Sequence, residues 1–227
     1  MATKRKVRKK RINEDQLVTY YLKVTRLAQK HFNQVLTGII VLVVIIAASI
    51  FIIQSRKSSA SNSERYLGAA LALMRQGDVA AAKTSFQDAH DRYANTRAGV
   101  VALYFKAECD LALQNFGEAL DGFEAYLHKA NKFPDFKATA TIGKTLALEG
   151  LNRPGDAADV LDKLIPDLNP KDPRYAASLY RVAVLSDKIG NSEKAVQYLQ
   201  KVIDIGSGPY LEEAEVKMAA LKSKQRG

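Results

Sequence analysis

The chain has 227 residues, 47% of them hydrophobic, and a formal net charge of +10, so it is long enough for one folded domain with an appendage and too apolar for a disordered chain. Residues 1–34 hold ten Lys or Arg against Glu14 and Asp15, whereas residues 55–227 hold 24 basic against 22 acidic residues, which argues against a nucleic-acid-binding protein. The single cysteine, Cys109, excludes an internal disulfide and a cysteine-based metal site.

Residues 1–12 form a basic tail that contains the run KRKVRKK. The simplest interpretation is a topology determinant that is also attracted to anionic lipid, by about 1 kcal/mol per basic residue near the surface. Contact with a ribosome or RNA is the alternative.

Residues 13–34 are expected to form an amphipathic helix. Their apolar side chains recur at steps of three and four residues from Leu17 to Phe32, which places them in one stripe along a helix. Asn13 and Gln16 match a capping box at its start. The stripe has two interpretations that remain open, which are a position at the membrane interface and pairing with a partner helix.

Residues 35–54 are predicted to cross a membrane. No charged residue occurs from Phe32 to Ser55, and the stretch Val35 to Ile53 is almost wholly aliphatic. As a helix its nineteen residues extend about 28 Å, close to the roughly 30 Å hydrocarbon thickness of a bilayer. A cleaved signal peptide is disfavoured because the segment before the apolar stretch would be unusually long.

The charges that flank the apolar stretch predict its orientation. Ten basic residues precede it, while only Arg56, Lys57 and Arg65 follow it closely. Basic flanks stay in the cytoplasm, so the N-terminus is expected inside and residues 55 onward outside. In a bacterium this corresponds to a single-pass protein of the inner membrane with a periplasmic main body.

After a Ser-rich linker over residues 55–62, two registers of small residues repeat in step over residues 63–222, and residues 223–227 form a short tail. The spacings in both registers are 37, 38 and 38 residues. The first register is Ala70, Ala107, Thr145 and Ala183, and the second is Ala82, Ala119, Ala157 and Ala195.

Each residue of the second register has the same surroundings. A turn residue lies five positions earlier (Gly77, Gln114, Asn152, Gly190) and a bulky residue four positions later (Phe86, Phe123, Leu161, Leu199). The pattern predicts an all-α solenoid in which each repeat is a helix, a short turn and a second helix. Later boundaries between repeats are marked by Pro134, Pro166, Pro170, Pro173 and Pro209, and residues 209–222 are expected to form a capping helix.

These residues resemble the tetratricopeptide repeat. The first repeat matches best, through Tyr66, Ala70, Leu73, Gly77, Asp78, Ala82, Phe86 and Ala89, and the third, LNRPGDAADVL, is the most degenerate. The layout as a whole, with NEDQLV before the span and EAEVKMAALK at the end, resembles the YfgM family, although the long basic tail departs from it. That resemblance implies an ancillary role at the Sec translocon beside periplasmic chaperones.

Nothing in the sequence indicates catalysis, a cofactor or a metal. The segment Gly206–Pro209 is interpreted as a turn, because it lacks the preceding strand and the following Lys-Ser or Lys-Thr of a phosphate-binding loop. His31, His90 and His128 have no second His at ligand spacing, and Cys109 is interpreted as a buried structural thiol.

In a tetratricopeptide array the first helix of each pair lines a concave groove. An offset of one residue from the packing stripe selects twelve candidate residues, which are Leu67, Leu71, Met74, Tyr104, Glu108, Leu111, Ile142, Leu146, Glu149, Tyr180, Val184 and Asp187. Three are acidic and none is basic, so an extended or helical segment with apolar anchors and some positive charge is the expected ligand. The alternative is that this stripe only packs neighbouring pairs together.

The sequence therefore predicts a membrane-anchored scaffold that binds protein partners, the Sec translocon and chaperones among them, and a second copy of the chain is a further candidate. Two alternatives remain, which are a coordinator of envelope assembly or cell division and a membrane tether that contacts ribosomes or nucleic acid through the basic tail. The fold alone does not choose among them.

Overall fold

The computed structural model describes residues 18–26 and 32–224. Within these residues the secondary structure is helical and contains no strand. The chain divides into two compact units, residues 1–57 and residues 58–227. The basic tail lies outside the described residues, as do residues 13–17 and 27–31 of the amphipathic segment, whereas residues 18–26 and 32–34 of that segment are helical.

Helix α2, Phe32–Arg75, contains the apolar stretch. Its large apolar side chains between residues 36 and 53 are exposed, from 44% at Leu36 to 74% at Phe51. Among the described residues, this helix is long and apolar enough to cross a membrane by length and composition. Residues 55–62, expected as a linker, are helical and lie within α2.

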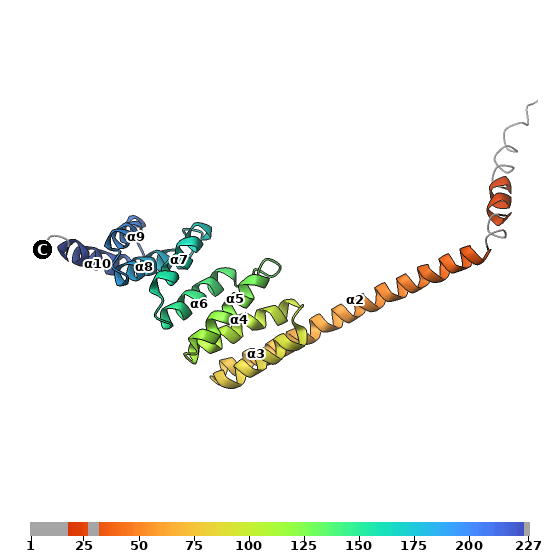
Figure 1. Cartoon of the computed structure of the whole chain (residues 1–227), viewed down its shortest axis with the longest axis horizontal. Coiled ribbons are helices and arrows are strands. Elements are labelled where there is room, and N and C mark those ends of the chain that lie inside the picture. Colours follow the sequence, from red (N-terminus) through yellow and green to blue (C-terminus); the bar gives the residue numbers. More distant parts are fainter. Residues whose placement is uncertain (1–17, 27–31, 225–227) are drawn as a thin grey trace, which may run out of the picture. The chain divides into compact units, whose positions relative to one another are not determined.

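The second unit is a solenoid of helix pairs, and its helices pack on one another in chain order (Figure 1). The last part of α2 pairs with α3 (Val79–Tyr93), α4 (Arg97–Ala112) with α5 (Phe116–Lys129), α6 (Lys137–Gly150) with α7 (Pro154–Leu164), and α8 (Pro173–Lys188) with α9 (Ser192–Asp204). A 3₁₀ turn, η1 (Ile165–Asp167), follows α7, and α10 (Leu211–Lys224) packs on α9 at the end. The predicted all-α solenoid is confirmed.

Both registers of small residues lie at the centre of the helix pairs. All eight of their members have an exposed fraction of 0%. The reason is close approach of the helices: a Cβ atom added to Gly122 of α5 would lie 2.9 Å from the Cβ of Ala107 in α4. Larger side chains at these positions would push the paired helices apart.

The bulky residues of the repeat fill the space beside the small ones. Phe86, Phe123, Leu161 and Leu199 each have an exposed fraction of 0%. The ring of Phe123 reaches from its own pair to α6, where a Cβ atom on Gly143 would lie 2.4 Å from it. One repeated position therefore contributes both to packing within a pair and to stacking between pairs.

The turn inside every pair has the same conformation. Gly77, Gln114, Asn152 and Gly190 have φ angles of 84°, 60°, 57° and 80°. In each turn the amide of the following residue donates to the carbonyl five positions earlier, as from Asp78 to Leu73 at 3.2 Å and from Asn115 to Asp110 at 2.8 Å. This is the Schellman pattern that closes a helix with a left-handed residue.

One buried carboxylate joins three helices. Asp110 of α4 is fully buried, and its carboxylate lies 2.6 Å from the ammonium of Lys83 in α3 and 2.7 Å from that of Lys106. Lys83 also contacts Glu118 of α5 at 2.5 Å. Burial would raise the pKa of Asp110, but the two lysines outweigh it and hold the pKa below its usual value.

Candidate protein-binding groove

The twelve candidate groove residues lie on the first helices of the four pairs, α2, α4, α6 and α8. Leu67 and Tyr104 are buried, with exposed fractions of 7% and 6%. The other ten are partly exposed. The exposure of the stripe therefore differs along the solenoid.

In the first half the stripe is filled by aromatic side chains. The ring of Tyr104 stacks on Phe136 with centroids 4.6 Å apart, and Phe105 packs against both rings. Burial and the neighbouring charge of Glu108 raise the pKa of the Tyr104 hydroxyl. Burial likewise raises the pKa of Glu108, against a hydrogen bond from Tyr104. Tyr104 therefore packs inside the protein, where a ligand has little access to it.

In the second half a hollow of about 360 Å³ is open between the third and fourth pairs. Four of the twelve candidates line it, namely Ile142, Glu149, Tyr180 and Val184. The ring of Tyr180 stacks on that of Tyr210, from the connection between α9 and α10, with centroids 5.3 Å apart. Two tyrosines and two aliphatic side chains give the hollow a largely apolar character.

The acidic candidates of the second half are paired with basic residues two helices further along the chain. The Arg181 guanidinium donates to Glu149 at 2.6 Å, and the Lys217 ammonium of α10 donates to Asp187 at 2.6 Å. Their charges are therefore compensated within the solenoid. A positively charged ligand was expected because the groove residues include acidic ones, and the pairing of Glu149 and Asp187 weakens that expectation.

Sequence reasoning missed several residues that line the hollow, which are Arg174, Ala177, Ser178, Arg181 and Tyr210. A single stripe was too narrow, because the face of a helix that contacts a groove covers at least 100° and includes neighbouring positions. The position of Arg181, directly after Tyr180, was a usable signal. Tyr210 gave no periodic signal, because it precedes α10 in a connection with positive φ at Gly206 and Gly208.

Cys109 is fully buried, as predicted, and burial raises the pKa of its thiol to about 11. The ring Nδ1 of His90 lies 2.8 Å from the carbonyl oxygen of Gly99, within hydrogen-bonding distance. Within residues 18–26 and 32–224, no group of three or more His, Cys, Asp or Glu residues comes together that could hold a metal ion. His31 lies outside the described residues.

The Tetratricopeptide repeat family matches residues 66–96 and 177–205, which correspond to the first and fourth pairs. No curated protein sequence matches the chain. Two of the predicted pairs, the second and the third, therefore depend on the structure and the register rather than on a family match.

Solved structures, in contrast, do match this chain in fold. MamA 41-end from Desulfovibrio magneticus RS-1 has a TM-score of 0.53 and 22% identity, over 67% of this chain and 76% of that one. A Podosopora anserina protein of nearly identical tetratricopeptide-like repeats has a TM-score of 0.59 and 16% identity, over 72% of this chain and 87% of that one. The pilF protein of Pseudomonas aeruginosa has a TM-score of 0.55 and 15% identity, over 74% and 71%. These similarities establish a tetratricopeptide-like fold.

Proposed function

We propose that this chain is a single-pass membrane protein whose extracytoplasmic solenoid holds a segment of a partner protein in the hollow between its third and fourth helix pairs. The solenoid acts as a scaffold, and the partner segment is extended or helical with an apolar or aromatic anchor. The expected partners are proteins that emerge from the Sec translocon and the chaperones that receive them, which the resemblance to the YfgM family supports.

The exposure of helix α2 supports membrane anchoring. Its side chains from Leu36 to Ile53 are large and apolar, and no other part of the described chain covers them. Exposure of this apolar surface to water would cost roughly 25 cal/mol of free energy per Å². A bilayer removes that cost, and the basic N-terminal flank favours a cytoplasmic N-terminus.

The hollow beside Tyr180 is the observation that carries the binding proposal. It has the size of a pocket for one or two side chains, and its walls include Ile142 and Val184. Arg181 and Glu149, which are paired with each other, also line the hollow and supply a donor and an acceptor for the backbone of a bound segment. This combination of apolar anchors and a few polar groups is typical of peptide recognition.

The test uses the full chain in its membrane. Tyr180→Ala removes one wall of the hollow, and Ala177→Gln fills part of it without removing packing. Both variants are expected to reduce crosslinking of partners to the solenoid by about tenfold, which corresponds to roughly 1.4 kcal/mol of binding free energy. The partners are identified by mass spectrometry after photo-crosslinking from a probe placed at Val184.

Val216→Ala is the matched control, because Val216 is an exposed apolar residue on α10 and does not line the hollow. It should leave crosslinking unchanged. Thermal unfolding is measured for every variant, so that loss of binding is separated from loss of stability. Unchanged crosslinking in both Tyr180→Ala and Ala177→Gln, with the fold intact, would place the binding surface elsewhere.

A further inference from the structure

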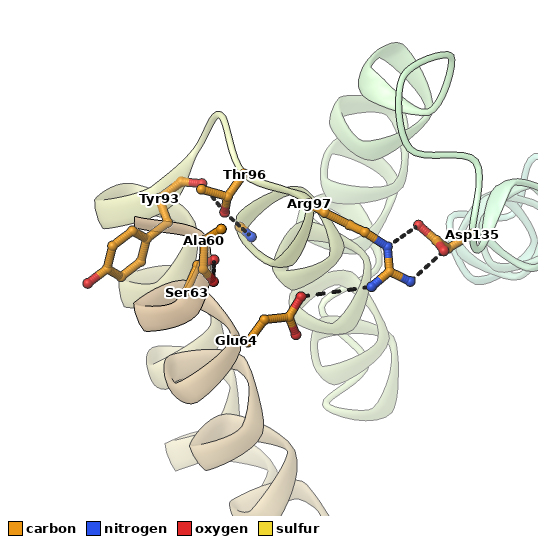
Figure 2. A network of polar contacts seen from close by, with 8 residues as sticks. Ala60, Ser63, Glu64, Tyr93, Thr96, Arg97 and Asp135 are labelled. Carbon is orange, nitrogen blue, oxygen red and sulfur yellow. Dashed lines mark hydrogen bonds and ion pairs between the residues drawn. The ribbon is translucent and has the colours of Figure 1, made fainter. Parts of the chain in front are cut away.

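One edge of the solenoid is formed where each helix pair connects to the next, and we call it the inter-pair edge. In the first two pairs it consists of residues 58–66, 91–97 and 128–137. Figure 2 shows how these segments are joined: Arg97, at the start of α4, donates to both carboxylate oxygens of Asp135, at 3.1 and 2.6 Å, and lies 3.8 Å from Glu64 of α2. The three segments therefore form one continuous surface.

This edge is basic. Its three segments contain six basic residues and three acidic ones: Arg65, Arg92, Arg97, Lys129, Lys132 and Lys137 against Glu64, Asp91 and Asp135. Two of the three acidic residues are paired with Arg97. The opposite edge of the same pairs, residues 75–80 and 111–118, carries Arg75 against Asp78 and Glu118. Of these two edges, only this one carries a net positive charge.

Lysines without an acidic partner surround a hollow of about 220 Å³ on this edge. It is lined by Lys129 and Lys132 together with Phe133, Val100 and His128. In the part of the chain that the structure describes, the ion pairs involve other basic residues and leave Lys129, Lys132 and Lys137 without a carboxylate within 4 Å. The Lys132 ammonium lies 5.2 Å from the centre of the Phe133 ring. Cations beside a partly exposed aromatic ring suit the interface of a membrane.

The chain itself limits how far this edge can lie from the apolar stretch. The second unit begins at Ser58, and the apolar stretch ends at Ile53. Five residues of fully extended chain span at most about 18 Å. Once the apolar stretch is in a bilayer, the start of the inter-pair edge therefore stays near the lipid headgroups, whatever the conformation of residues 54–57.

We propose that the inter-pair edge binds the anionic phospholipid headgroups of the bilayer that holds the apolar stretch of α2. This inference rests on the membrane anchoring proposed above. Lys129, Lys132 and Lys137 contact the headgroup phosphates, and Phe133 lies at the level of the headgroups. The acidic residues of the edge oppose this only in part, because the six basic residues outnumber the three acidic ones and Arg97 lies beside both Glu64 and Asp135. The solenoid is thereby held against the membrane by its basic edge.

The experiment reconstitutes the full chain in nanodiscs of phosphatidylcholine alone or with phosphatidylglycerol added. The rate of amine acylation is measured for each lysine by mass spectrometry. Lys129, Lys132 and Lys137 should react about threefold or more slowly when phosphatidylglycerol is present, and high salt should restore their rates. Lys188 and Lys222, which are exposed elsewhere on the solenoid, serve as internal controls and should not change.

A pair of matched variants separates charge from simple proximity. Lys129→Gln with Lys132→Gln should abolish the lipid-dependent protection of backbone amides 130–133 against hydrogen exchange, while Arg75→Gln with Lys188→Gln should retain it. Equal acylation rates in both kinds of nanodisc would overturn the proposal, as would protection that appears only when a partner protein is added. Incorporation of the chain into nanodiscs after an alkaline wash reports on the anchoring separately, so that failure of the anchor is not mistaken for failure of the edge.

Discussion

The turn residues show how single positions control each helix pair. Gln114 and Asn152 adopt a left-handed conformation that side chains disfavour, at the positions where the other two pairs have glycine. A left-handed residue other than glycine costs roughly 1–2 kcal/mol. The repeat therefore requires the conformation strongly enough to impose it on Gln114, whereas Asn152 is the kind of residue that tolerates it best after glycine.

Two glycines of the first pair provide a test of this requirement. A Cβ atom would meet nothing within 4 Å at either Gly68, inside α2, or Gly77, which has a φ of 84°. Gly77→Ala should lower the free energy of unfolding by about 1 kcal/mol because of its conformation. Gly68→Ala should raise it by about 0.5–1 kcal/mol because alanine favours the helix. Denaturant unfolding measures both, and equal effects of the two changes would contradict a conformational role for Gly77.

At the scale of the helices, the small residues determine how closely each pair packs. Ala119 of α5 is fully buried, and Gly122, three positions later, approaches Ala107 of α4. Both lie on the side of α5 that faces α4. The distance between paired helices therefore depends on side chains no larger than a methyl group.

Ala119→Leu should separate α4 from α5 and lower the free energy of unfolding by roughly 1–3 kcal/mol through overpacking. Ala125→Leu, at an exposed position of the same helix, is the control and should stay within about 0.5 kcal/mol of the parent. Thermal or denaturant unfolding distinguishes the two. A similar small effect of both substitutions would mean that α5 can shift without cost.

The packing of the helices could be predicted from the sequence because it repeats. Gln114 and Asn152 occupy the repeat positions that are equivalent to Gly77 and Gly190, so their left-handed conformation could be predicted from the register. Contacts that occur in only one pair could not be predicted. Tyr104 is buried because Phe136, in a non-periodic connection, stacks on it, and Asp110 is buried where the equivalent positions carry Leu73, Leu148 and Ser186.

The charges of the groove show the same limitation. Glu149 and Asp187 are neutralised by Arg181 and Lys217, which come from helices two further along the solenoid. Periodicity indicates which face of a helix a residue occupies, but it does not give the direction of a long side chain from a neighbouring helix. The half of the groove that is open could therefore be identified only from the structure.

At the scale of the whole chain, the proposed orientation predicts which side of the membrane the solenoid occupies. A phosphatase that folds only outside the cytoplasm, fused after Lys57, should be active because the basic flank precedes the apolar stretch. A fusion before Phe32 should be inactive and serves as the control. Protease digestion of residues 60–227 from the cytoplasmic face of sealed inverted vesicles would contradict this orientation.

The buried thiol of Cys109 has a consequence for measurements on the intact chain. Because its pKa is raised to about 11 and its side chain is fully buried, a thiol reagent reaches it only when the second helix pair opens. When closing is faster than modification, the observed rate equals the intrinsic rate multiplied by the equilibrium constant for opening. The rate of Cys109 modification therefore reports local unfolding of the native chain. This rate can be compared with and without a bound partner in living cells.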